Sequence, residues 1–173
     1  MEFTTKVFVS LTPDEQLKLH SLIMNNNDVG DALTLSDSFN IQRDPDLGAN
    51  VTIAKDGGKL VGVILWGPSH LTGMMVNNPS VPNKIISVGF DPDKAYTTQI
   101  IVISEDYRGQ GVGSRLSLSL RAEAISMGYT SRLDFGYRSE SVVGFATANR
   151  GSAAIDLDHT DVRGYAVSLF PLV

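Results

Sequence analysis

Apolar and polar positions alternate or recur at helical spacing through the first quarter of the chain. Residues 6–11 predict a short strand. Thr12, Pro13 and Glu15 then form a typical helix start, with a capping hydroxyl, a proline in the first turn and a carboxylate at the third position. The apolar positions that follow keep helical spacing up to the asparagine run at 25–27, where we expect this helix to end.

Two pairs of β-rich runs predict hairpins. The first is "ANVTIAKDGGKLVGVILWG", in which two such runs flank the turn Asp56-Gly57-Gly58. Asp and Gly tolerate the positive φ that a tight turn requires. The second hairpin is expected near the end of the chain, from residues 152–158 and 164–172 around His159.

The middle of the chain predicts a strand, a loop, a helix and a further strand. Residues 96–103 form an apolar run of strand length, and residues 129–137 predict the later strand. Between them, the leucine spacing fits both a strand and a helix. The length of the segment and Gly128 at its end favour a helix.

Other segments give weaker signals. Short helices are expected over 31–36 and 139–151. Residues 68–95, which contain four prolines, predict an irregular connection with a short strand at 85–88.

Composition narrows the possible classes of protein. The chain has 173 residues, 42% of them hydrophobic, which suits one globular domain. It contains no cysteine, which excludes disulfides and fits a reducing compartment, and we expect a cytoplasmic protein. A net charge of −5 argues against a nucleic-acid partner. We recognise neither a signal peptide nor an apolar run that spans a membrane.

The glycine-rich segment Arg108–Gly113 is the main candidate for chemistry. Glycines before a helix allow backbone N–H groups to approach a phosphate, so this segment is a candidate pyrophosphate site. It lacks the Gly-Lys-Ser/Thr ending of a P-loop. A dinucleotide fingerprint fits in part, through Gly109, Gly111 and Asp134, although Ser114 replaces the third glycine. A turn without a ligand is the remaining alternative.

A third pattern fits more positions. The segment "ISEDYRGQGVGSRL" resembles the coenzyme A motif R/Q-x-x-G-x-G/A of the GNAT superfamily of N-acetyltransferases, with Arg108, Gly111 and Gly113 at its fixed positions. The preceding hairpin also resembles that family's. The resemblance implies one α/β domain of the α+β type over residues 1–173. Its mixed, mostly antiparallel sheet would be flanked by helices and have splayed central strands.

The same resemblance implies the activity and the cofactor site. The protein would transfer an acetyl group from acetyl-CoA to a primary amine of a small molecule, peptide or protein, without a metal. Backbone groups of the strand end would bind the pantetheine arm and thioester, and the loop would bind the pyrophosphate. The implied residues are Ile101, Val102, Ile103, Arg108, Gly109, Gln110, Gly111, Val112, Gly113 and Ser114.

The catalytic groups of the family are harder to locate. Residues 97–99 contain no carboxylate to act as a base, and the segment 139–148 contains no tyrosine to act as an acid. Tyr137 is the nearest candidate acid, and a half-buried strand tyrosine is the alternative interpretation. A catalytically silent acyl-CoA-binding or interaction domain of the same fold therefore stays open.

The remaining candidate sites have weaker signals. The three histidines are scattered along the chain, and the turn with Asp156, Asp158 and Asp161 lacks the glycine and the glutamate of a calcium loop. We therefore expect no metal. The GNAT resemblance implies that the last hairpin borders the acceptor site, so Asp158 and Asp161 are candidates for attracting a cationic amine. A solvated acidic turn is the alternative. Residues 74–88 are a candidate wall of the acceptor pocket, with a simple surface loop as the equal alternative. Pairing of sheet edges is a candidate route to a homodimer.

Overall fold

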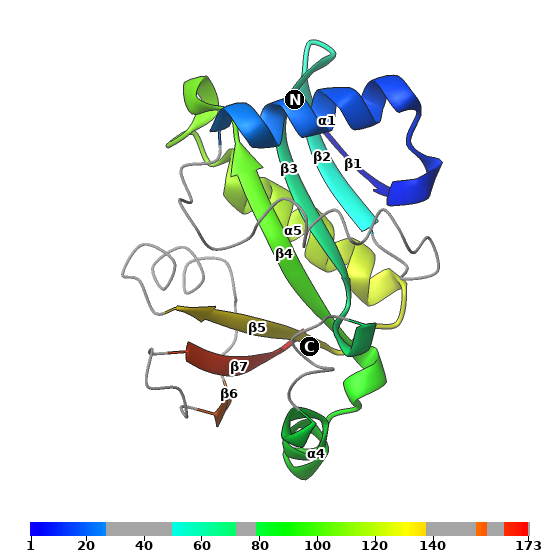
Figure 1. The fold of residues 1–173 in the computed structure, drawn as a ribbon, viewed down its shortest axis with the longest axis vertical. Coiled ribbons are helices and arrows are strands. Elements are labelled where there is room, and N and C mark those ends of the chain that lie inside the picture. Colours follow the sequence, from blue (N-terminus) through cyan, green and yellow to red (C-terminus); the bar gives the residue numbers. More distant parts are fainter. Residues whose placement is uncertain (27–49, 72–78, 138–154, 159–164, 173) are drawn as a thin grey trace. The chain divides into compact units, whose positions relative to one another are not determined.

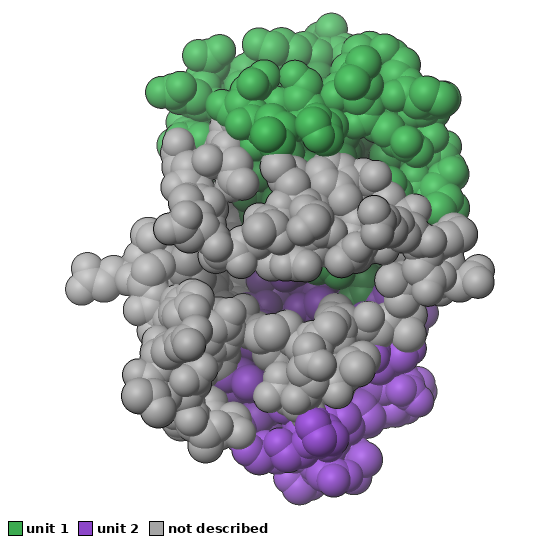
Figure 2. Space-filling view, in the orientation of Figure 1, with its two compact units in different colours: residues 1–67, 99–120 green, residues 68–98, 121–173 purple. Residues whose placement is uncertain are grey.

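The computed structural model describes residues 1–26, 50–71, 79–137, 155–158 and 165–172. These residues fall into two compact units, coloured separately in Figure 2. Unit 1 comprises residues 1–67 and 99–120, and unit 2 comprises residues 68–98 and 121–173. The helices expected over 31–36 and 139–151 lie outside the described residues.

Unit 1 contains a sheet with the strand order β1-β2-β3-β4 (Figure 1). Strands β1 (Glu2–Val7) and β2 (Asn50–Asp56) pair antiparallel, as do β2 and β3 (Lys59–Pro68). The β2–β3 pair is the predicted hairpin. Strand β4 (Ala95–Ile103) contributes its last residues to this unit, and Ser104 N donates to Val61 O at 2.9 Å. Because the end of β4 meets the start of β3, these two strands also run antiparallel.

Helices cover both faces of this sheet. Helix α1 (Pro13–Asn26) packs Leu19 and Ile23 against Val63 and the other apolar side chains of one face. Gly62, the neighbour of Val63 on β3, faces the opposite side, where it meets helix α5 (Val112–Ser126). This alternation is what a strand imposes on consecutive side chains.

The start of α1 is as predicted, but the first strand is not. Thr12 Oγ1 accepts from Glu15 N at 3.2 Å and Glu15 Oε2 accepts from Thr12 N at 3.1 Å, which is a capping box. Strand β1 ends at Val7, and the short 3-10 helix η1 (Phe8–Ser10) follows where a strand was expected. The reason is tertiary, because η1 turns Phe8 into the core shared with α1.

Unit 2 contains the strand order β4-β5-β7-β6, with β5 at Ser131–Tyr137, β6 at Ile155–Asp158 and β7 at Tyr165–Pro171. Strand β7 pairs antiparallel with both β5 and β6, which confirms the second predicted hairpin. The short 3-10 helices η3 (Ser69–Leu71) and η4 (Pro92–Lys94) also belong to this unit.

The strand expected at 85–88 is wrong. Those residues fall at the end of helix α4 (Ser80–Ser87), whose Val81 and Ile85 are buried in the core of unit 2 beside Leu133 and Leu169. Their i, i+4 spacing puts both side chains on one face of a helix. That spacing was the sequence signal for a helix. The β-branched residues Ile85, Ile86 and Val88 favoured a strand and obscured it.

The fold class is confirmed, and the dinucleotide alternative is wrong. Within unit 2, strand β4 pairs parallel with β5 at Ala95–Ser131 and Tyr96–Arg132. The β1–β2, β2–β3, β5–β7 and β6–β7 pairs are antiparallel, whereas a dinucleotide-binding fold requires a parallel sheet. None of the described helices is long and apolar enough to cross a bilayer.

Candidate functional site

The glycine segment forms the entry to helix α5. It follows β4 through the 3-10 helix η5 (Glu105–Tyr107) and contains two glycines with positive φ, Gly109 at 71° and Gly111 at 75°. The first helical hydrogen bond runs from Arg115 N to Gly111 O at 3.1 Å, so Gly111 caps the helix. Positive φ at two positions explains why glycine is needed there.

The backbone N–H groups of this loop are available to a ligand. Within the described part of the chain, no hydrogen bond is recorded from the N–H groups of residues 109–114. At α1, by contrast, Thr12 and Glu15 satisfy the helix start, and Asp14 adds a second carboxylate to the first turn. The first turn of α5 has no acidic residue. A helix start with free N–H donors and no carboxylate in its first turn attracts an anion.

Side chains, instead of these N–H groups, hold the loop in shape. Arg108 Nε donates to Ile103 O at 3.3 Å, and Gln110 Nε2 donates to Asp106 O at 2.7 Å. Tyr107 Oη donates to Asp56 Oδ2 at 3.1 Å. This hydrogen bond to a carboxylate stabilises the protonated phenol and is the largest cause of the raised pKa of Tyr107.

A close approach of backbone and helix lies behind the loop. A Cβ at Gly62 would lie 2.9 Å from both Ile103 Cδ1 and Leu116 Cδ1 and 3.4 Å from Val112 Cγ1. Ile103 ends β4 and Val112 begins α5, so Gly62 lets the two ends of the loop pack against β3.

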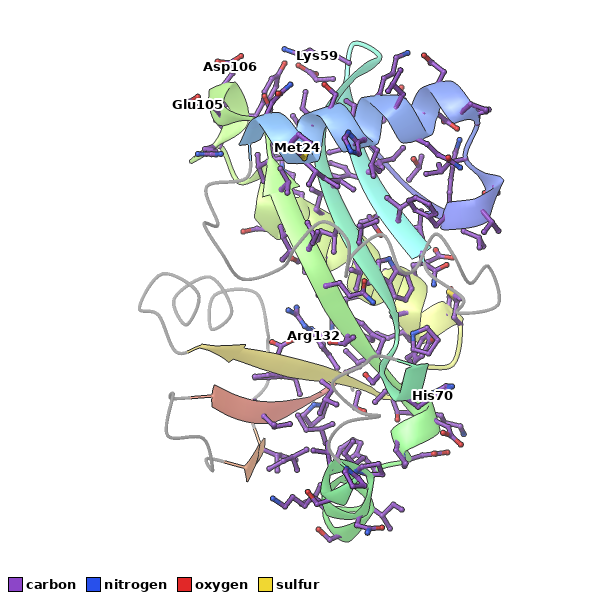
Figure 3. All side chains as sticks on the ribbon, viewed as in Figure 1. Met24, Lys59, His70, Glu105, Asp106 and Arg132 are labelled. Atoms are coloured by element: carbon purple, nitrogen blue, oxygen red, sulfur yellow. The ribbon has the colours of Figure 1, made fainter. Side chains whose placement is uncertain are left out.

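The predicted cofactor residues are thus adjacent parts of unit 1. Ile101, Val102 and Ile103 are the last three residues of β4, and Val102 is buried in the core against α1. The Ile103 carbonyl already accepts from Arg108, so its backbone is partly engaged. Glu105 and Asp106 are exposed beside the loop, and Figure 3 labels them together with Lys59.

The other predicted site residues belong to unit 2 or lie outside the described residues. Tyr137 ends β5, where its backbone is in register with Tyr165. Asp158 ends β6 in register with Val167, and Asp161 lies outside the described residues. Of the segment 74–88, residues 74–78 are outside them too, while 80–87 form α4.

Asp134 is engaged within unit 2. Its Oδ1 accepts a hydrogen bond from Arg132 Nε at 2.6 Å, and both side chains are largely buried, at 17% and 14% exposed. This ion pair is a structural role for the carboxylate that the dinucleotide fingerprint assigned to a ribose. Among the residues described, no group of three or more His, Asp or Glu side chains is arranged to hold a metal.

Sequence reasoning missed Asp56 and Gly62 as parts of the site. Both were visible only as members of a predicted hairpin. A carboxylate at a turn and a glycine inside a strand are each weak signals. Only the glycine carried a usable hint, because a glycine inside a strand often marks the close approach of another segment.

Comparison with known proteins identifies the family. The sequence model of the acetyltransferase (GNAT) family matches residues 18–138, which include the loop and its flanking elements. The chain belongs to the GNAT family. No curated protein matches this GNAT chain at a significant level.

Solved structures agree with the GNAT fold. An acetyltransferase of the GNAT family from Listeria monocytogenes is 16% identical, with a TM-score of 0.66, over 99% of this chain and 95% of its own. A GNAT family N-acetyltransferase from Escherichia coli, solved in complex with CoA, is 15% identical, with a TM-score of 0.60, over 100% and 83%. The ribosomal-protein alanine N-acetyltransferase of Escherichia coli is 11% identical, with a TM-score of 0.59, over 99% and 94%.

Proposed function

We propose that this GNAT protein is an acetyl-CoA-dependent N-acetyltransferase that acts on a primary amine. The observation that carries the proposal is the row of N–H groups at residues 109–114, which have no recorded partner among the described residues at the start of α5. Six adjacent donors and two exposed positive-φ glycines suit a pyrophosphate, the most anionic part of the CoA chain. The related structure in complex with CoA supports the same ligand.

Two segments of the chain bind different parts of acetyl-CoA in this proposal. Residues 109–114 hold the pyrophosphate through backbone N–H groups. Arg108, whose own N–H donates to Glu105 O, keeps the loop against the end of β4 through its side chain. Ile101 to Ile103 present backbone groups to the pantetheine arm and the thioester. Bound acetyl-CoA supplies the acyl group as a thioester. A backbone donor aimed at a thioester oxygen stabilises its developing negative charge, typically by about 2.7–4 kcal/mol.

The proposal covers the whole chain as one N-acetyltransferase domain. The family match runs from residue 18 to residue 138 and includes parts of both compact units. The related structures also cover 99% or more of the chain. A cysteine-free chain fits a reducing compartment, so the proposal includes a cytoplasmic location. A homodimer joined through sheet edges is also part of the proposal.

Tyr137 is our proposed general acid for the departing thiolate. The proposed attraction of a cationic amine rests on Asp158 and Asp161, and residues 74–88 are the proposed wall of the acceptor pocket. An alanine of a protein is the acceptor named for one related structure, which supports peptide or protein amines beside small molecules. Substituting both aspartates by asparagine is expected to raise the acceptor KM and leave the acetyl-CoA Kd unchanged.

A specific observation favours a second function. Strand β4 has the sequence AYTTQIIVI, which contains no carboxylate or histidine to accept a proton from the amine. A catalytically silent acyl-CoA-binding domain would have the same loop and the same strand. This alternative predicts acetyl-CoA binding without turnover of any amine.

Calorimetric titration with acetyl-CoA tests the proposal, with NAD and ATP as control ligands. Gly111→Asp introduces a carboxylate at the cap of α5 and is expected to abolish binding. Gly128→Asp is the matched control, because Gly128 also has a positive φ, of 89°, and open space around a Cβ, but lies past the other end of α5.

Three results are informative. Micromolar acetyl-CoA binding that Gly111→Asp alone abolishes supports the site, and a screen of amine acceptors then separates the enzyme from the silent domain. Equal losses in both variants would assign the effect to backbone strain. No binding by the wild type would refute the function and leave the glycines as a turn.

A further inference from the structure

The hydrogen bond between Asp56 and Tyr107 joins residues 51 positions apart in the chain. Asp56 ends β2 at the hairpin turn, and Tyr107 ends η5, directly before the loop of residues 108–114. Lys59, on the other side of the turn, places its Nζ 5.8 Å from the centroid of the Tyr107 ring. The hairpin therefore holds the same ring by its hydroxyl and by its face.

The charge of Asp56 does not itself suit a phosphate site. A carboxylate close to an anion-binding loop opposes the anion, so a benefit from Asp56 has to come through geometry. The raised pKa of Tyr107 agrees with this role, because the phenol stays protonated and keeps donating. Arg108, the next residue, donates to Ile103, so the entry to the loop is held at two consecutive positions.

A loop held in its binding conformation loses less conformational freedom when the ligand binds. Gly109 and Gly111 have wide backbone freedom, and their positive φ values set the direction of the neighbouring N–H groups. The side chain that precedes them is thus well placed to restrict that freedom.

We propose that Asp56 and Tyr107 are positioning residues of the cofactor site, through which the β2–β3 turn orders the pyrophosphate loop. This inference rests on the proposed function. Neither side chain touches the reacting atoms. Their hydrogen bond determines the affinity for the pyrophosphate half of acetyl-CoA and leaves the chemical step unchanged.

Tyr107→Phe is the sharpest test, because it removes the hydroxyl and retains the ring beneath Lys59. We expect the acetyl-CoA Kd and KM to rise about tenfold, with kcat unchanged at saturating acetyl-CoA. The Kd for 3′-phospho-ADP, the nucleotide half of CoA, should rise by the same factor, and the Kd for pantetheine should equal that of the wild type. Amide hydrogen exchange at residues 109–114 should become faster.

Asp56→Asn is the second variant, which keeps an acceptor oxygen but removes the charge, and we expect a smaller loss of about threefold. Its other carboxylate oxygen lies 3.9 Å from the Met1 amino group, so Tyr107→Phe remains the cleaner change. Tyr129→Phe is the matched control, a tyrosine of unit 2 that contacts Tyr96 edge to face. It should leave all binding constants unchanged.

Circular dichroism and thermal unfolding establish that each variant is folded. Unchanged acetyl-CoA affinity in folded Tyr107→Phe, or an equal loss for pantetheine, would overturn the inference while leaving the proposed function intact. A wild-type protein that does not bind acetyl-CoA would overturn both. These two failures are therefore distinguishable in one titration series.

Discussion

Gly62→Ala, which adds a single methyl group, tests the packing behind the cofactor loop. In Gly62→Ala, the new Cβ lies 2.9 Å from the terminal methyls of Ile103 and Leu116, which is closer than carbon atoms pack, and 3.4 Å from Val112 Cγ1. Both close atoms end rotatable side chains, so they can move aside. Because these side chains belong to the end of β4 and the start of α5, between which the loop is held, we expect their rearrangement to displace both ends of the loop slightly.

The expected loss of stability is modest. Overpacking of a core typically costs about 1–3 kcal/mol, and rotatable neighbours favour the lower half of this range. Replacing a strand glycine by alanine offsets this loss by about 0.5–1 kcal/mol, because the unfolded chain then has less conformational entropy to lose on folding. The free energy of unfolding should therefore fall by about 1 kcal/mol, which for a protein of this size lowers the Tm by about 2–4 °C.

The free energy of acetyl-CoA binding should weaken by more than the free energy of unfolding falls. We expect the Kd to rise about tenfold, equivalent to about 1.4 kcal/mol, because converging N–H groups lose alignment when either end of the loop moves. Urea unfolding, followed by the fluorescence of the single tryptophan, gives the stability, and calorimetry gives the Kd.

Gly89→Ala is the control for this prediction. Gly89 has a φ of 87° and nothing within 4 Å of an added Cβ, and it lies in unit 2 after α4. Its strain of about 1–2 kcal/mol should lower stability without changing the Kd. A Gly62→Ala protein with wild-type stability and Kd would refute the packing argument. An equal rise in Kd in Gly89→Ala would show that global stability, and not loop geometry, controls binding.

Two further predictions concern stability. The pKa of Glu15 is lowered from 4.5 to about 2, chiefly by the hydrogen bond from Lys6, so its contribution is present above pH 4.5 and is lost as the pH falls toward 2. Glu15→Gln should flatten the dependence of urea midpoint on pH in this window, and an equally steep profile would contradict the reasoning. Thr52→Val removes the buried acceptor of Trp66 Nε1, at 3.0 Å, and should cost about 1–3 kcal/mol in chemical unfolding. Exposed Thr4→Val, on the paired strand, should change stability by no more than about 0.5 kcal/mol, and a similar cost at both positions would refute the assignment.

Elements with strong local signals were predicted well. The capping residues Thr12 and Glu15 marked the start of α1, and Asp56-Gly57-Gly58 marked the first hairpin. The glycine segment 108–113 was placed between a strand and a helix, as the structure has it. In each case the signal depends on residues within a few positions, through a cap or a required φ.

Elements that depend on distant partners were predicted poorly. β-branched residues at 85–88 suggested a strand, yet burial of Val81 and Ile85 in the core of unit 2 stabilises a helix. Likewise, pairing with β2 determines that β1 spans residues 2–7, and burial of Phe8 ends it. Local propensity is weak beside such packing.

The sequence by itself determined the family, the order of most elements and the location of the cofactor loop, because the spacing of Arg108, Gly111 and Gly113 is local. Only the tertiary structure decided which N–H groups stay free and which side chains hold the loop. The hydrogen bond from Tyr107 to Asp56 spans 51 residues, and the contact at Gly62 brings together a strand, a second strand and a helix. Such contacts follow from three-dimensional packing, which no spacing along the chain records.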